Sequence, residues 1–223
     1  MDGFKNETLN KIFESSIAIT KIIAHLIQCS AKMKSDCIDA GSMLKALEDV
    51  ITNELVEKYL NDEFTGFTFV PQPSVTINDE TGLYTGRPDI VVFSFNRFLN
   101  PKAYFIIECK RIDGTPYFNR EYIIEGVARF FDPPKRPKYP SYYNRNIMFG
   151  YIIKALDVPH NASKIEKLQQ SLLKELSAGE LVLTQKEDSQ HYVYTCEYTS
   201  THVGKIELRH LFFNFSDIIA TKS

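Results

Sequence analysis

Three charged residues interrupt two segments whose other residues are mostly apolar. Asp89 precedes the run IVVFSF, and Glu108 and Lys110 follow the run AYFII. A charge beside a buried strand is costly unless it is paired, hydrogen-bonded or bound to a cation, and two neighbouring carboxylates repel each other. A divalent cation removes that repulsion, and oxygen ligands of this kind suit Mg²⁺. The pattern therefore predicts a cation site where two strands meet.

On the second strand, Glu108, Cys109 and Lys110 point to alternate faces and can therefore have different roles. Side chains alternate along a strand, so Glu108 and Lys110 share one face, while Cys109 points to the other face. The backbone carbonyl of Cys109 is then a further oxygen ligand for the metal. Lys110 could orient or help to deprotonate a water, or stabilise negative charge that develops on phosphorus. The alternative is that Glu108 and Lys110 simply pair with each other at a solvated strand end.

A helix before these strands supplies a third carboxylate. Residues 43–60 have a helical pattern, with Ser42 as the expected N-terminal cap. Glu54 and Glu57 fall at the edge of the apolar stripe or away from it, so we expect both to be solvated. Glu48 lies within the stripe, where an acid needs a partner, and it is our choice for the site. The stripe is formed by Leu44, Leu47, Ile51 and Leu55.

The remaining elements follow from hydrophobic periodicity. Residues 4–33 predict an amphipathic helix or helix pair, which we expect to pack on its own domain; a dimerisation arm is the alternative. The chain as a whole predicts an α/β or α+β sheet flanked by helices. Further helices are expected at 119–131 and at 164–176 after a Ser163 cap, and strands within 67–79, 87–95, 102–112, 147–155, 181–184, 191–199 and 205–215.

Local charge favours a nucleic-acid partner. Residues 97–154 hold eleven basic and five acidic residues, although the whole chain has a net charge of -2. Basic side chains followed by tyrosines suit phosphate contact and base stacking, although a solvated Pro-rich loop is the alternative. Arg129 could bind phosphate, clamp a catalytic acid, or pair with Glu125 one turn earlier. We assign nucleic-acid contact to Arg87, Arg111, Tyr122, Arg129, Lys135, Arg136 and Lys138.

The motif residues resemble a known signature. Pro88 and Asp89, followed 19 residues later by Glu108, Cys109 and Lys110, are similar to the PD-(D/E)XK signature of the restriction-endonuclease-like nucleases. The resemblance implies a mixed β-sheet flanked by α-helices. It also implies a Mg²⁺-dependent endonuclease, with Mn²⁺ as a substitute, that cuts DNA and leaves a 5′-phosphate. Many members carry a Gln followed by Tyr on the helix after the second strand, and this chain departs from that pattern.

The resemblance also implies an organisation and a biological setting. It covers residues 42–155, which we expect to form the catalytic core of a single nuclease domain over 1–223, with 1–41 as an N-terminal helical extension. The family is rich in restriction and phage-defence enzymes, so prokaryotic genome defence is the expected role. Cutting both strands of a duplex usually needs two active sites, so a homodimer is a further expectation.

The implied roles are specific, and one rival function stays open. Asp89 and Glu108 hold the metal, Glu48 completes the acidic cluster, and Lys110 acts on the attacking water. The rival is a catalytically inactive nucleic-acid-binding or interaction module on the same fold. A cluster of buried charges is costly, so a chain freed from catalysis has no physical need to keep it.

Composition excludes several other classes. The 223 residues are 43% hydrophobic and 24% charged, which is typical of a globular protein. The four cysteines form neither a disulfide framework nor a metal knuckle, which indicates a reducing, cytoplasmic location. No segment predicts a membrane span, and the histidines lack the spacing of a zinc site. No phosphate-binding glycine loop or nucleophile elbow is present.

Overall fold

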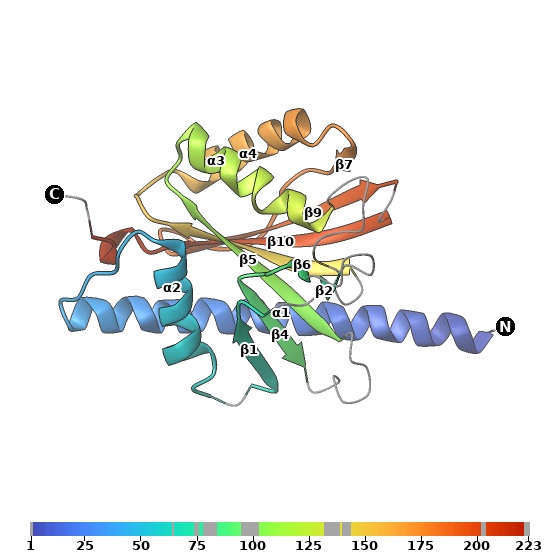
Figure 1. The fold of residues 1–223 in the computed structure, drawn as a ribbon, viewed down its shortest axis with the longest axis horizontal. Helices are drawn as coiled ribbons and strands as arrows, with labels where there is room; N and C mark the ends of the chain where they lie inside the picture. Colours follow the sequence, from blue (N-terminus) through green and yellow to red (C-terminus); the bar gives the residue numbers. More distant parts are fainter. Residues whose placement is uncertain are drawn as a thin grey trace.

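A computed structural model describes residues 2–63, 65–73, 76–77, 84–94, 103–131, 139, 144–201 and 204–220, with side chains in the first helix described from Glu14 onward. A mixed β-sheet forms the centre, with helices on both of its faces (Figure 1). The sequence-based prediction of a mixed α/β fold is therefore confirmed.

Within the described residues, eight strands form one sheet in the order β1-β4-β5-β6-β10-β9-β7, with β8 paired to β9. The pairs β5–β6 and β6–β10 are parallel, and the other pairs are antiparallel. A separate small sheet consists of β2 and β3. The strands are β1 (Phe67–Pro71), β2 (Thr76–Ile77), β3 (Tyr84–Gly86), β4 (Ile90–Ser94), β5 (Tyr104–Ile112), β6 (Arg145–Ile152), β7 (Leu176–Ala178), β8 (Val182–Glu187), β9 (His191–Ser200) and β10 (Gly204–Asn214).

The first helix, α1 (Asp2–Asp39), is one continuous helix that runs beneath one face of the sheet (Figure 1). Its buried residues recur every three or four positions, which keeps them on one side of the helix. Ile19, Ile22, Leu26 and Met33 are fully buried in a core shared with α2 and the sheet. The prediction that this helix packs on its own domain is confirmed.

The second helix starts later than the sequence predicts. α2 spans Glu48–Leu55 and continues as a π-helix over Val56–Leu60. The segment before it is extended, because Leu44 donates to the carbonyl of Ile218 and accepts from the amide of Ala220. These bonds to the C-terminal segment satisfy the backbone groups that a first helical turn would have used. The prediction of a helix from residue 43 with a Ser42 cap is therefore wrong.

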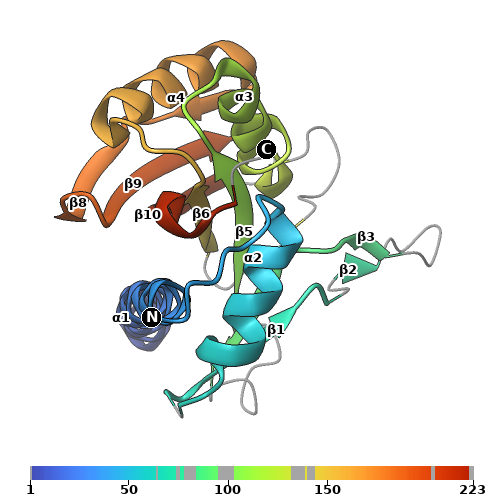
Figure 2. The same ribbon diagram turned by 90° about the vertical axis from the view of Figure 1, so that its left-hand side faces the viewer.

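On the other face, α3 (Pro116–Ile124) and α4 (Val158–Leu172) cover the sheet (Figure 2). The predicted continuous helix over 119–131 is wrong, because α3 ends at Ile124 and a 3-10 helix follows over Val127–Phe130. Gly126 lies between them, and a side chain there would collide with the Tyr122 carbonyl oxygen and with Met148.

The cap of α4 also differs from the prediction. Asp157, whose carboxylate accepts from the amide of His160 at 3.0 Å, begins the helix instead of Ser163. The helix therefore starts before residue 164, because a carboxylate that accepts a first-turn amide satisfies one of its free donors.

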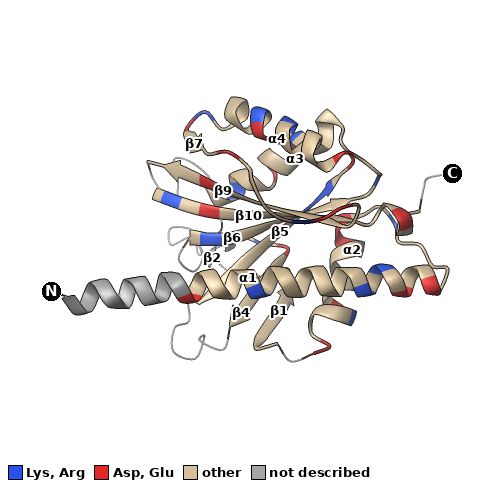
Figure 3. Ribbon diagram, turned by 180° about the vertical axis from the view of Figure 1, so that it is seen from behind, with Lys and Arg blue, Asp and Glu red and all other residues tan. Residues whose placement is uncertain are grey.

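On the face shown in Figure 3, acidic and basic residues are interspersed over several elements. No helix among the described residues is long and apolar enough to cross a membrane.

Candidate active site

The motif residues lie where β4 and β5 stop pairing. The ladder between these strands runs only as far as the pair Ile90–Ile107. Immediately beyond it, the Asp89 Oδ2 atom accepts a 2.7 Å hydrogen bond from the backbone amide of Cys109. The side chain of Asp89 thus takes over the amide that the next ladder position would have satisfied. This bond fixes the carboxylate of Asp89 beside β5.

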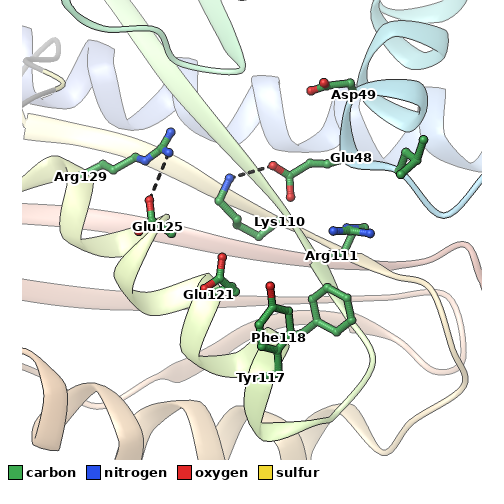
Figure 4. Close-up of a pocket in the computed structure, with 10 residues that line it drawn as sticks. Glu48, Asp49, Lys110, Arg111, Tyr117, Phe118, Glu121, Glu125 and Arg129 are labelled. Carbon is green, nitrogen blue, oxygen red and sulfur yellow. Dashed lines mark hydrogen bonds and ion pairs between the residues drawn. The ribbon is translucent and has the colours of Figure 1, made fainter.

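Four oxygen-bearing groups converge on the ammonium group of Lys110. Its Nζ lies 2.8 Å from Glu48 Oε1, 3.0 Å from Glu108 Oε1 and 3.7 Å from Asp89 Oδ2. It also donates to the backbone carbonyl of Cys109 at 2.7 Å. Figure 4 shows Lys110 and Glu48 pointing toward each other from β5 and α2. The four groups predicted to hold a metal are therefore gathered around one cation that belongs to the protein itself.

The structure separates the three glutamates of the helical segment as the sequence analysis expects. Glu48 is in the first turn of α2 and reaches Lys110. Glu54 pairs with Lys58 at 2.7 Å on the outer side, and Glu57 is exposed. Among these three, Glu48 alone joins the cluster.

Two contacts hold α2 so that Glu48 faces the cluster. Before Glu48, the guanidinium group of Arg111 donates to the carbonyl of Ala46 at 2.7 Å. One turn after Glu48, the Thr52 and Tyr151 hydroxyls lie 3.0 Å apart, and Tyr151 donates to the Cys109 thiol at 3.0 Å. The turn that carries Glu48 is therefore anchored at one end by Arg111 of β5 and at the other end by Tyr151 of β6.

Arg129 clamps the buried acid from the other side. Its guanidinium group donates to Glu108 Oε1 at 2.8 Å and to the Tyr139 hydroxyl at 2.9 Å, and it lies 3.4 Å from Glu125. Two of the alternatives for Arg129, the acid clamp and the pair with Glu125, are thus present together. Tyr139 in turn donates to the carbonyl of Arg87 at 3.1 Å.

Burial sets the protonation of this cluster. Burial, together with the nearby Asp89 carboxylate, raises the pKa of Glu108 to about 8, and burial also raises the pKa of Asp89. For Lys110, burial alone would lower the pKa, but Glu108, Asp89 and Glu48 outweigh it and hold this pKa above its usual value. Lys110 is therefore a firmly protonated ammonium group at neutral pH.

The oxygen donors of the cluster are of the type that divalent cations prefer, but they are arranged around Lys110. Glu108 is fully buried, and its Oε2 atom has no hydrogen-bond partner among the described residues. A buried carboxylate oxygen without a partner costs free energy, which a bound cation would recover. In the part of the chain that the structure describes, no group of three His, Cys, Asp or Glu side chains already has metal-binding geometry. Mg²⁺ holds its ligands at about 2.1 Å, so metal binding needs the Lys110 ammonium to withdraw and the carboxylates to close in.

A cavity of about 570 Å³ opens beside the cluster (Figure 4). It is lined by Glu48, Lys110, Arg111 and Arg129, which the sequence analysis assigns to the site, and by Leu47 and Glu125. The lining also includes residues to which the sequence analysis gave no role: Asp49, Tyr117, Phe118 and Glu121. Tyr117 and Glu121 lie eight and four residues before Glu125, a helical spacing that identifies Tyr117 and Glu121 once the start of α3 is placed correctly.

Some predicted nucleic-acid contacts do not reach this cavity. Tyr122 is fully buried, and its hydroxyl bonds to His210 at 2.9 Å, so the prediction that it contacts nucleic acid is wrong. Arg87 is exposed and donates to the carbonyl of Gln72 at 3.2 Å, away from the cavity lining. Arg111 lines the cavity, with its guanidinium group over the ring of Phe118 at 5.0 Å. Lys135, Arg136 and Lys138 lie outside the described residues.

No family model matches this chain, and searches of curated proteins and of solved structures also find no match.

Proposed function

We propose that this chain is a nuclease of the PD-(D/E)XK type that hydrolyses phosphodiester bonds in DNA with Mg²⁺, or with Mn²⁺ in its place. One observation supports this most strongly: Glu48, Asp89, Glu108 and the Cys109 carbonyl converge on Lys110. The sequence signature alone could arise by chance, but a chance pattern would not place a distant helix carboxylate in the same cluster.

The finer fold assignment belongs to the same proposal. The helix α2 precedes the motif strands β4 and β5, which lie in a mixed sheet flanked by helices, and this supports the restriction-endonuclease-like arrangement that the signature implies. We further propose a cytoplasmic role in prokaryotic genome defence, with a homodimer where both strands of a duplex are cut.

Each residue of the cluster would have its own role in phosphodiester hydrolysis. Glu48, Asp89, Glu108 and the Cys109 carbonyl would hold the ion, which supplies Lewis-acid stabilisation of the phosphodiester and acidifies a water. In the metal-free cluster the carboxylates keep Lys110 protonated, and the ammonium group that the ion displaces would donate to the attacking water and to the phosphate oxygens. This favours orientation and charge stabilisation by Lys110 over the alternative role of a base. Arg129 positions Glu108 through their 2.8 Å bond.

One observation favours the rival function, an inactive nucleic-acid-binding module. Lys110 and Arg129 already contact Glu108, so the cluster is partly neutralised without a metal. The two functions differ in their dependence on a cation, because a binding module on this fold would engage nucleic acid without hydrolysing it.

The first test is cleavage of supercoiled plasmid, single-stranded DNA and RNA by the purified protein in Mg²⁺ or Mn²⁺. We expect nicking of DNA that EDTA and Glu108→Ala both abolish. Glu54→Ala is the control, because Glu54 is a carboxylate outside the cluster that pairs outward with Lys58. Nucleic-acid binding without cleavage under any of these conditions would favour the inactive module instead.

A further inference from the structure

The end of the cavity away from Arg129 has an apolar and aromatic character. Tyr117 is 64% exposed and Leu47 is 51% exposed, yet both line the cavity beside Lys110. They come from different walls, because Tyr117 is in the first turn of α3 and Leu47 immediately precedes α2. In Figure 4, the α3 residues Tyr117, Phe118 and Glu121 point toward the strand that carries Lys110 and Arg111.

The ring of Tyr117 packs against the neighbouring ring of Phe118. It meets the ring of Phe118 edge-on, with centroids 5.2 Å apart and planes at 74°. Phe118 lies beneath the guanidinium group of Arg111, which is itself tied to the carbonyl of Ala46. The hydroxyl of Thr115 caps this turn by accepting from the amide of Phe118. A platform held in this way loses little conformational entropy when a flat ligand stacks on it.

The charges of the cavity favour a base over a run of phosphates. The lining holds more carboxylates than cations: Glu48, Asp49, Glu121 and Glu125 against Lys110, Arg111 and Arg129. The side-chain carboxylate of Glu121 forms no hydrogen bond or ion pair with any described residue. Such carboxylates repel a phosphate backbone laid along the cavity. They accept hydrogen bonds from the exocyclic amino groups of nucleobases. The buried cation Lys110 lies beyond them, where a single adjoining phosphate could approach.

We infer that this cavity binds one unpaired nucleobase, packed between Tyr117 and Leu47, with the adjoining phosphate directed toward Lys110. The inference rests on the proposed function and narrows its substrate to single-stranded or locally unpaired nucleic acid. Bases within a duplex are stacked on both sides, so only an unpaired base can offer a free face to the Tyr117 ring.

The test is fluorescence anisotropy in EDTA with a short fluorescein-labelled oligodeoxynucleotide, its duplex, and the matching oligoribonucleotide. We expect the wild-type protein to bind a single strand more tightly than the duplex. Tyr117→Ala should weaken single-strand binding about 5- to 100-fold, Tyr117→Phe should restore it, and Leu47→Ala should weaken it less. Leu183→Ala is the matched control, because Leu183 is also exposed, at 43%, but lies on β8 outside the cavity lining.

Equal binding of single strand and duplex, or binding that Tyr117→Ala leaves unchanged, would overturn the inference. Both substituted side chains are exposed, so we expect the variants to fold, and their thermal unfolding checks this.

Binding in EDTA does not depend on cleavage, so the two proposals can fail separately. Tyr117-dependent binding by a protein that cleaves nothing would remove the nuclease and keep the base site. Cleavage by a protein whose single-strand binding does not depend on Tyr117 would keep the nuclease and remove the base site. Comparison of the two single strands shows which sugar is preferred.

Discussion

Lys110→Met is expected to lower the rate of metal-dependent DNA cleavage by about 10²- to 10⁴-fold, the range typical of a lost proton-transfer or charge-stabilising group. Methionine keeps much of the apolar length of the side chain and removes the ammonium group that contacts Glu48 and Glu108. The measurement is the initial rate of plasmid nicking at saturating Mg²⁺. Lys58→Met is the control, since Lys58 forms an exposed pair with Glu54 outside the cavity.

The same variant should also depend more strongly on the metal for its stability. Without the ammonium group, the carboxylates of Glu48, Asp89 and Glu108 face one another with only Arg129 nearby. Mg²⁺ should therefore raise the thermal unfolding temperature of Lys110→Met more than that of the wild type. If the variant keeps full cleavage activity, Lys110 only balances charge, and its assigned role in the reaction is incorrect.

At pH 9, Arg129→Met is expected to lower the free energy of unfolding by about 3 kcal/mol, because it removes one of the two cations that compensate the buried Glu108 carboxylate. Glu108 is fully buried and would retain only Lys110. Urea unfolding of the metal-free protein measures the effect. Arg120→Met is the control, because Arg120 is exposed on α3, the helix that precedes the 3-10 helix of Arg129.

The loss of free energy of unfolding in Arg129→Met should increase as the pH rises. In the folded wild type, the pKa of Glu108 is raised from 4.5 to about 8. As the pH rises, the unfolded chain therefore loses this proton at a lower pH than the folded protein does. The contribution of Glu108 to the free energy of unfolding falls between pH 4.5 and about pH 8. Arg129 lowers this pKa, so its removal raises the pKa further and extends the fall above pH 8. The difference in the free energy of unfolding between the wild type and Arg129→Met therefore increases from about pH 6 to about pH 9. Glu108→Gln in the same background should close most of the gap; if it does not, the loss comes from packing.

The central part of the site could be predicted because its signals are local. Alternation along one strand places Glu108 and Lys110 together, and the apolar stripe of one helix selects Glu48. Both predictions survive even though α2 begins five residues later than expected, because Glu48 keeps its position relative to Ile51 and Leu55.

The remaining parts depend on contacts between distant segments. The extended start before α2 exists because Leu44 bridges to Ile219, a partner that no local pattern reveals. A continuous helix over 119–131 would place Tyr122 and Arg129 on one face toward nucleic acid, whereas the close approach of the chain at Gly126 ends the helix between them. The cavity itself, with Tyr117 on one wall, follows from how α2 and α3 are placed around β5.

The proposed nuclease activity requires the oxygens around Lys110 to bind a divalent ion. The most direct measurement is a titration of the purified protein with Mn²⁺, followed by electron paramagnetic resonance of the free ion, for the wild type and for Asp89→Asn. We predict saturable uptake of Mn²⁺ by the wild type, competition by Mg²⁺, and a loss of affinity of at least about tenfold in the variant. Absence of saturable Mn²⁺ binding by a folded wild-type protein, or equal binding by Asp89→Asn, would contradict the account.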